Sequence, residues 1–121
     1  SDLPEYWDYY MKHYFGLSTQ SNYCDGVMQD VHWPSGSYGY FPSYTLGRLF
    51  ASQIYQSIVG DIPALDEAVS NGDFSYAINW LRENIHIKAS LLASDDLIQQ
   101  ATGSKLSVNS FVQHLNDRYL E

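Results

Sequence analysis

The sequence has little cysteine, little positive charge and no long apolar run, and each shortage excludes a class of protein. Cys24 is the only cysteine, so no intrachain disulfide can form, which favours a reducing, cytoplasmic setting. Six basic residues stand against 14 acidic ones, giving a net charge of -8. This balance argues against nucleic acid and against an anionic membrane surface as partners, because both are bound by clustered Lys and Arg. No run of about 18 apolar residues occurs, so no transmembrane helix is predicted.

Common catalytic signatures are also missing. The sequence contains no His-Glu-x-x-His motif, no Cys-x-x-Cys pair, no Gly-x-Ser-x-Gly elbow and no phosphate-binding glycine loop. Its histidines are scattered and lack the i and i+4 spacing of a metal site on one helix: His13, His32, His86 and His114. We therefore expect no metal ligands in this chain. Taken alone, such histidines are typical of ordinary surface or half-buried positions.

Length and pattern predict one helical domain. A chain of 121 residues is the size of a single domain, and 45% hydrophobic residues suits a globular protein. No segment alternates apolar and polar residues between hairpin turns, so a sheet is not indicated. We predict an all-α fold, an irregular multi-helix array that forms a single helical unit over residues 1–121.

Capping and turn residues place the helices. Asp2 is expected to cap a helix that ends at Gly16, and Asp25 to cap a short helix over residues 26–32. A long helix should run from Pro42 to Gly60, and further helices should begin near Pro63, Asp73, Ser94 and Ser107. Apolar spacing predicts two buried stripes, one of Phe74, Ala77, Ile78, Leu81 and Ile85, the other of Val108, Phe111, Val112, Leu115 and Tyr119.

The segment from Gly26 to Gly47 gathers most of the residues that could carry chemistry. It holds Gln29, Asp30, His32 and Trp33, together with three tyrosines and four glycines. If residues 26–32 are helical, Gln29 and His32 share one face. The glycine-rich loop that follows can bring its backbone close to a ligand. Such hydrogen-bond donors suit holding a carboxylate or stabilising an oxyanion. The alternative is a Tyr- and Gly-rich loop that packs over a helical core.

The order Gly26-x-x-Gln29-Asp30-x-His32-Trp33 resembles a signature of the carboxypeptidase Taq-type zinc metallopeptidases. The continuation over residues 36–47 is similar to the family's Gly-Ser-Phe-Gly-Tyr-Phe-Pro-Thr-Tyr, and residues 73–74, 80–86 and 101–103 resemble its C-terminal helices. The resemblance covers nearly the whole chain. It implies an all-helical, cytoplasmic, commonly homodimeric enzyme that releases C-terminal residues from peptides with zinc or a similar ion such as cobalt.

The same resemblance implies that the chain is a C-terminal part of such an enzyme and forms one wall of its substrate groove. The family's metal-binding His-Glu-x-x-His helix, its later Glu and its arginine motif do not occur here. By resemblance, His32 and Tyr40 are the candidate catalytic residues, with the Tyr40 phenol stabilising the oxyanion. The candidates for substrate binding, or for supporting these two, are Gln29, Asp30, Tyr38 and Tyr44.

Several interpretations stay open at this point. Asp30 is expected either to fix the tautomer of His32 or simply to tie the loop, and Tyr44 either to contact substrate or to join the core. Trp33 and Phe41 are expected to pack. The chain by itself should be inactive, and the alternative function is a stand-alone, non-catalytic helical module that binds peptides or other proteins. Tyr6, Trp7, Tyr10 and Tyr14, on the helix over residues 4–15, should be exposed where the missing part of the enzyme would cover them, and they should favour self-association.

Overall fold

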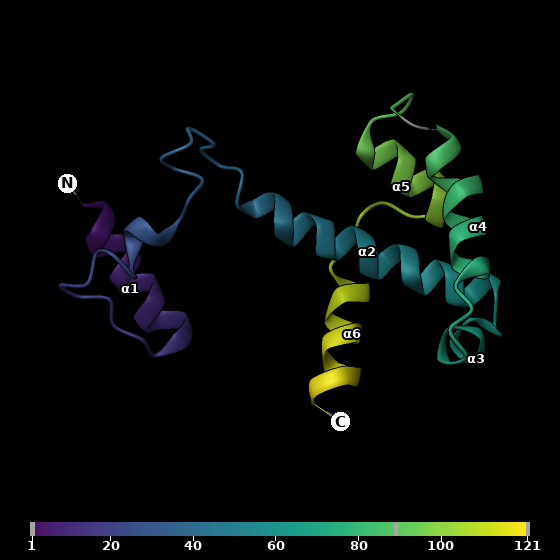
Figure 1. Cartoon of the computed structure of the whole chain (residues 1–121), viewed down its shortest axis with the longest axis horizontal. Coiled ribbons are helices and arrows are strands. Elements are labelled where there is room, and N and C mark those ends of the chain that lie inside the picture. The colour runs from purple at the N-terminus through teal and green to yellow at the C-terminus, as the bar shows by residue number, and fades with distance from the viewer. Residues whose placement is uncertain (1, 89, 121) are drawn as a thin grey trace. The chain divides into compact units, whose positions relative to one another are not determined.

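The chain folds into helices, which confirms the all-α prediction. The computed structural model describes residues 2–88 and 90–120, and no strand occurs among them (Figure 1). In chain order the elements are α1 (Leu3–Phe15), the 3-10 helix η1 (Val27–Gln29), α2 (Pro42–Asp61), α3 (Leu65–Ser70), α4 (Ser75–Asn84), the 3-10 helix η2 (His86–Lys88), α5 (Ser94–Thr102) and α6 (Asn109–Tyr119).

The chain divides into two compact units, one up to Pro42 and one from Ser43 onward. Whether these units form the single helical unit predicted above stays a prediction. Over the described ranges, no helix combines the length and the apolar character that crossing a bilayer requires.

In the first unit, α1 has the predicted limits. Gly16 adopts a φ of 68°, the left-handed conformation in which glycine closes a helix at little cost. Asp2 makes no side-chain capping hydrogen bond, and its carbonyl oxygen instead accepts the Tyr6 N–H at 3.0 Å. The helix therefore begins where the sequence indicates, but its first turn is closed by backbone.

The loop after α1 is tied back to the helix by Asp8. The Asp8 carboxylate accepts the Thr19 backbone N–H at 2.7 Å and lies 2.8 Å from the Lys12 ammonium. The hydrogen bond from Lys12 is the largest cause that lowers the pKa of Asp8 to about 2, against the opposing effect of partial burial. Farther along the chain, Trp33 meets the Trp7 ring edge-on, with the ring centroids 6.1 Å apart. Trp7 is therefore partly buried and not exposed as predicted, whereas Tyr6, Tyr10 and Tyr14 are exposed. These contacts join the helix to the segment that carries the candidate site.

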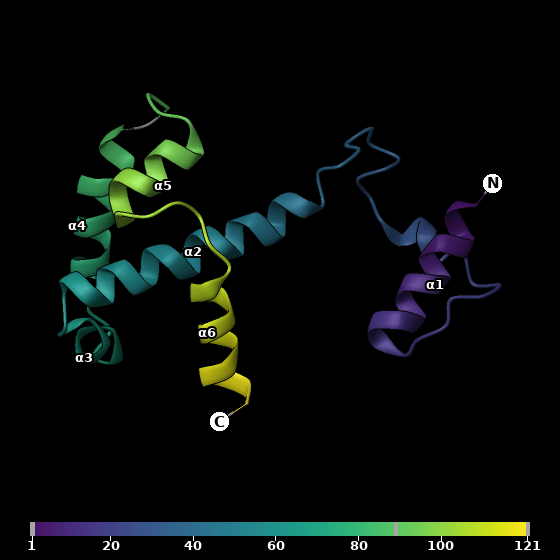
Figure 2. The ribbon, with the colours of Figure 1, turned by 180° about the vertical axis from the view of Figure 1, so that it is seen from behind.

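In the second unit, the core lies where α2, α3 and α4 meet. Ile58, Leu65 and Trp80 are 3%, 1% and 7% exposed and form one cluster. The Trp80 indole N–H donates to the Asp61 carboxylate at 2.7 Å, so its polar atom is satisfied at the edge of the cluster. Figures 1 and 2 both show α3 and α4 near the C-terminal end of α2.

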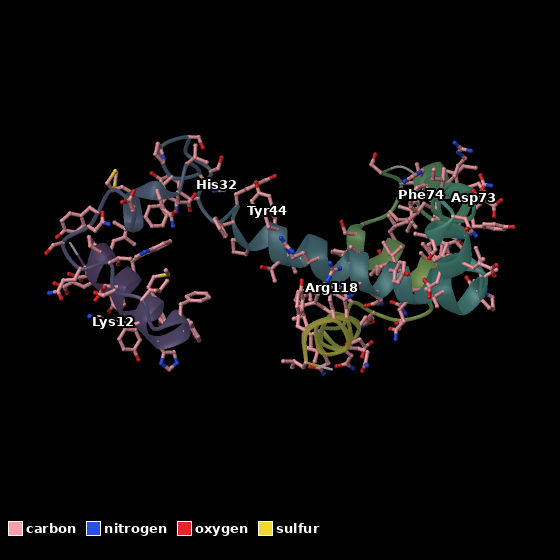
Figure 3. The ribbon with its side chains drawn as sticks, turned by 60° about the horizontal axis from the view of Figure 1, so that its bottom comes forward. Lys12, His32, Tyr44, Asp73, Phe74 and Arg118 are labelled. Carbon is pink, nitrogen blue, oxygen red and sulfur yellow. The ribbon has the colours of Figure 1, made fainter. Side chains whose placement is uncertain are left out.

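The predicted stripes of two helices are partly wrong. α4 buries Trp80, whereas Phe74, just before the helix (Figure 3), and Ile78 are 54% and 47% exposed. No residue of α6 is buried, although apolar spacing predicted a stripe there. The reason is that a helix buries the face that its neighbours reach. In α4 that face carries Trp80, which packs with Ile58 and Leu65.

Asp73 supports the start of α4, although it lies one residue before the N-cap position, which Phe74 occupies. Its carboxylate accepts the Ser75 backbone N–H at 2.9 Å. Hydrogen bonds from the Ser75 side chain and backbone lower the pKa of Asp73. The residue predicted to cap this helix therefore does satisfy one of its first N–H groups.

α2 is also tied to the segment between α5 and α6, through the buried side chain of Gln53. The Gln53 Nε2 lies 2.9 Å from the Thr102 hydroxyl, 3.2 Å from the Ser104 carbonyl oxygen and 3.2 Å from the Lys105 carbonyl oxygen. Its Oε1 accepts the Ser107 backbone N–H at 2.9 Å. Only 4% of Gln53 is exposed, so one amide joins segments about 50 residues apart.

Candidate substrate-binding site

The segment with the candidate residues is not a helix over residues 26–32, as was predicted. η1 covers only Val27–Gln29, and Asp30 is extended with φ -73° and ψ 109°. The cause is local, because the Asp30 carboxylate accepts the His32 backbone N–H at 2.9 Å. Such side-chain-to-backbone bonds compete with helical ones. Gln29 and His32 therefore do not share a helical face.

Asp30 also holds the His32 ring. The Oδ1 atom that accepts the backbone N–H lies 2.5 Å from the ring Nδ1. Asp30 is 8% exposed and His32 is half-buried. The hydrogen bonds from His32, the backbone one first, lower the pKa of Asp30 despite the opposing effect of burial. Because an ionised carboxylate only accepts hydrogen bonds, the proton of the ring contact lies on Nδ1.

This placement of the proton determines what the other ring nitrogen of His32 can do. With Nδ1 protonated, Nε2 is an acceptor in the neutral imidazole and a donor in the imidazolium. A second hydrogen bond donated by the ring therefore requires the charged form. The sequence left two roles open for Asp30, and its carboxylate has both: it ties the loop and it holds the His32 ring.

Two aromatic rings flank the imidazole. The Tyr40 ring stacks on His32 with centroids 5.3 Å apart and planes at 27°, and the Phe41 ring meets it edge-on at 5.4 Å and 78°. Tyr40 is 51% exposed. Phe41 was predicted to pack, but it is 58% exposed, although its ring meets that of His32. The structure brings the predicted catalytic pair into contact.

A tight turn returns the chain from His32 toward Tyr40. The His32 carbonyl oxygen accepts the Ser37 N–H at 2.8 Å and the Ser35 hydroxyl at 2.9 Å. Gly36 and Gly39 have φ angles of 76° and 73°, which residues with a side chain rarely adopt. Sequence reasoning gave the two serines no role. The Ser-Gly-Ser spacing was the available signal, since serine hydroxyls commonly close turns.

The other candidate residues are less closely connected. Gln29 ends η1 and is exposed, and Tyr38 is 79% exposed on the loop. Tyr44 belongs to the first turn of α2, in the second unit, and is 53% exposed, which argues against a core position (Figure 3). The structure therefore gathers Asp30, His32 and Tyr40 into one cluster.

Gly26, the first residue of the segment, is required by close packing. A Cβ atom there would lie 2.6 Å from the Asn22 carbonyl oxygen and 3.1 Å from the Thr19 Cβ. Non-bonded atoms do not approach so closely, so any side chain would push this turn away from the loop after α1. Gly26 thereby fixes where η1 and the candidate site begin.

The described residues do not fit a metal centre. Over residues 2–88 and 90–120, no three or more His, Cys, Asp or Glu side chains gather so that they could hold an ion. Asp30 and His32 form an ion pair when the imidazole is protonated. The imidazole of His32 and the phenol of Tyr40 are groups that can hydrogen-bond a ligand.

The sequence matches the family model described as carboxypeptidase Taq (M32) metallopeptidase over residues 1–119. The chain belongs to this family. It is 37% identical over 118 residues to Carboxypeptidase 1 of Bacillus subtilis, covering 98% of this chain and 23% of the relative. It is 39% identical over 119 residues to Thermostable carboxypeptidase 1 of Pyrococcus furiosus, covering 98% and 24%. The chain thus spans about a quarter of the length of these M32 relatives.

Solved structures of M32 proteins have the same fold over this length. Metallocarboxypeptidase 1 of Trypanosoma cruzi matches with a TM-score of 0.95 at 35% identity, over 99% of this chain and 25% of that one. The M32 carboxypeptidase of Deinococcus radiodurans matches with a TM-score of 0.92 at 32% identity, over 98% and 24%. Both the sequence and the fold therefore support the resemblance that the signature at residues 26–33 first indicated.

Proposed function

We propose that this chain supplies one wall of the substrate groove of a metallocarboxypeptidase, and that His32 and Tyr40 contact the peptide there. The observation that carries the proposal is their cluster. The Tyr40 ring stacks on an imidazole whose Nδ1 is held by the buried Asp30. Membership of the M32 family supports the reaction, which is hydrolysis of the C-terminal residue of a peptide.

Each residue of the cluster has its own role in this proposal. The Tyr40 hydroxyl donates a hydrogen bond to the oxyanion that forms at the scissile carbonyl, a contact typically worth about 3 kcal/mol of barrier. His32, as the imidazolium, donates from Nε2 to the terminal carboxylate of the substrate. Asp30 is a positioning residue that keeps the proton on Nδ1. The weaker candidates for substrate contact are Gln29, Tyr38 and Tyr44.

The remaining parts of the proposal concern the complete enzyme. Its metal ion is zinc or cobalt, bound by residues other than those described here. A cytoplasmic location and a homodimer, both implied by the resemblance, stay predictions. The chain alone is expected to be inactive, since its residues 2–88 and 90–120 offer no ligand set for the ion.

The first experiment uses the 121-residue chain by itself. C-terminal residue release from a simple peptide is measured with added Zn²⁺ or Co²⁺. No turnover is expected. Clear turnover would show that the chain contains a complete catalytic site and would refute this part of the proposal. Peptide binding by the chain without any metal, followed by NMR, would instead favour the stand-alone binding module.

The second experiment uses the complete enzyme that carries this segment. Tyr40→Phe removes only the hydroxyl and should lower kcat by roughly 100- to 1,000-fold with a small change in KM. Tyr119→Phe is the matched control, because Tyr119 is exposed on α6 and has no role in the proposal. If Tyr40→Phe keeps kcat within twofold of the unmodified enzyme, Tyr40 does not stabilise the oxyanion.

A third measurement separates positioning by Asp30 from a structural role. Asp30→Asn still accepts hydrogen bonds from His32 but no longer offers a charge to the imidazolium. KM should therefore rise while the protein stays folded. A loss of folded protein with KM unchanged in the fraction that folds would assign Asp30 to the fold alone.

A further inference from the structure

His32 and Tyr40 are connected by backbone hydrogen bonds that meet at one residue, Ser37. An extended chain between positions 32 and 40 could span up to about 28 Å, yet the two rings stack with centroids 5.3 Å apart. The Ser37 N–H donates to the His32 carbonyl oxygen at 2.8 Å, and the Ser37 carbonyl oxygen accepts the Tyr40 N–H at 3.2 Å. We name residues 35–39 the bridge.

The first half of the bridge is a turn of the Schellman type, which closes many helices. Gly36 has a φ of 76° and donates its N–H to the Trp33 carbonyl oxygen at 3.0 Å, while the Ser37 N–H reaches the His32 carbonyl oxygen. The Ser35 hydroxyl donates to the same His32 oxygen at 2.9 Å. The peptide group that follows His32 is therefore fixed by two donors from the bridge.

The second half of the bridge is the turn from Ser37 to Tyr40. Gly39 is the third residue of this turn and has a φ of 73°, which is the position and the sign of φ that a type II turn requires. A residue with a side chain rarely adopts that angle, and for a β-branched residue it is an outlier. The direction in which the chain enters Tyr40 therefore depends on Gly39.

Backbone conformation, and not lack of space, explains the two glycines of the bridge. Within the part of the chain that the structure describes, a Cβ atom at Gly36 or Gly39 would meet nothing within 4 Å. Gly26 differs, because a Cβ atom there would lie 2.6 Å from the Asn22 carbonyl oxygen. A side chain at either bridge glycine is thus opposed by the positive φ, so a substitution there tests the backbone of the turn.

We propose that the bridge positions the two rings for catalysis. Ser37, through its backbone, and Gly36 and Gly39, through their positive φ, set the distance and the angle between the His32 imidazole and the Tyr40 phenol. This role rests on the proposed function, in which both rings contact the same peptide. A displacement of about 1 Å between groups that act together can cost about 100-fold in rate. These three are positioning residues, since they act through the two rings.

The test compares valine with asparagine at position 39 in the complete enzyme that carries this segment. The two side chains are similar in size, but asparagine tolerates a positive φ far better than valine does. Gly39→Val should lower kcat by roughly 100-fold, whereas Gly39→Asn should keep kcat within about threefold of the unmodified enzyme. A clash with another part of the enzyme would instead lower kcat in both variants and would overturn the proposal. Gly36→Val and Gly36→Asn repeat the comparison in the first half of the bridge.

Gly72→Val is the matched control. Gly72 has a φ of 79° and open space around its Cβ position, as the bridge glycines have, but it lies between α3 and α4. The control should therefore lose stability, which thermal unfolding measures, and keep its kcat. A loss of kcat as large as that of Gly39→Val would show that any strained turn impairs the enzyme, and the positioning role would then be wrong.

A measurement on the 121-residue chain separates this role from the proposed function. NMR records the nuclear Overhauser effect between the ring protons of His32 and Tyr40, and circular dichroism confirms that each variant keeps its helices. The ring contact should be lost in Gly39→Val and kept in Gly39→Asn and Gly72→Val. If Gly39→Val keeps the contact, the bridge does not set the geometry and the proposal is overturned. If the contact is lost while kcat of the complete enzyme is unchanged, the bridge does set the geometry, and it is the proposed function of the two rings that fails.

Discussion

Replacing Gln53 by methionine tests how the second unit is held together, because one buried amide connects α2 to the segment between α5 and α6. Methionine has a similar length and is apolar, so it fills the same space without hydrogen bonds. It leaves the Ser107 N–H without its acceptor and removes a donor from the Ser104 and Lys105 carbonyl oxygens. Stranding a buried N–H costs about 1–3 kcal/mol, and a lost hydrogen bond costs about 1 kcal/mol more. We expect the free energy of unfolding to fall by about 2–4 kcal/mol.

Urea unfolding followed by circular dichroism measures this change, with Gln56→Met as the matched control. Gln56 lies on the same helix but is exposed, and it accepts the Ser110 hydroxyl. The control should cost less than about 1 kcal/mol. Hydrogen exchange of the Ser107 amide should accelerate in Gln53→Met and not in the control. If the two variants lose the same stability, the Gln53 network does not hold the unit together.

Gln53→Glu distinguishes lost hydrogen bonds from altered packing. The glutamate keeps an acceptor for the Ser107 N–H but turns a negative charge toward the carbonyl oxygens of Ser104 and Lys105. Its pKa should therefore rise on folding, because only the protonated carboxyl can donate to a carbonyl. A raised folded-state pKa gives stability that is present below the unfolded value and is lost as pH rises. The variant should thus recover stability on acidification, whereas Gln53→Met should not.

Three further predictions concern the ends and turns of helices. Gly26→Ala should lower stability by about 1–3 kcal/mol, because its Cβ meets the Asn22 carbonyl oxygen at 2.6 Å, whereas Gly47→Ala, with open space around its Cβ, should not destabilise. Urea unfolding compares the two. Folding lowers the pKa of Asp8 from 3.8 to about 2, so its stabilisation is full above pH 3.8 and is lost as pH falls toward 2. Asp8→Asn should remove this acid-dependent part, which denaturation midpoints across that pH range will show, and an unchanged pH profile would contradict the assignment. Asp73→Ala should cost about 1 kcal/mol by thermal unfolding, because the first N–H of α4 loses its acceptor.

Local sequence signals placed the helix ends to within a few residues. Gly16 closes α1 in the left-handed conformation, which is a property of the residue itself, whereas α2 continues through Gly60 to Asp61. The same local reasoning failed at residues 26–32. There the Asp30 side chain competes for the His32 N–H, and η1 stops after a single turn. Aspartate favours both caps and turns, so its presence alone does not say which of the two forms.

Apolar spacing was a weaker guide to burial. It selected Phe74 and Ile78 for the core, yet Trp80 is the buried residue of α4. Spacing identifies which residues share a face, but it does not say which face meets a neighbour. Apolar spacing also missed Gln53, which is polar and yet buried. It is buried because the segment between α5 and α6 supplies hydrogen-bond partners for its amide.

The sequence by itself determined the all-helical class, the ends of α1 and the M32 signature at residues 26–33, because these depend on residue type and order over short distances. Only the tertiary structure decided that the Asp30 carboxylate holds the His32 ring and that Tyr40 stacks on it. That arrangement depends on the turn at Gly36 and Gly39, which carries the chain back on itself. The spacing of residues along the sequence does not predict which way the chain turns there. The turn direction follows from backbone angles and hydrogen bonds that form together.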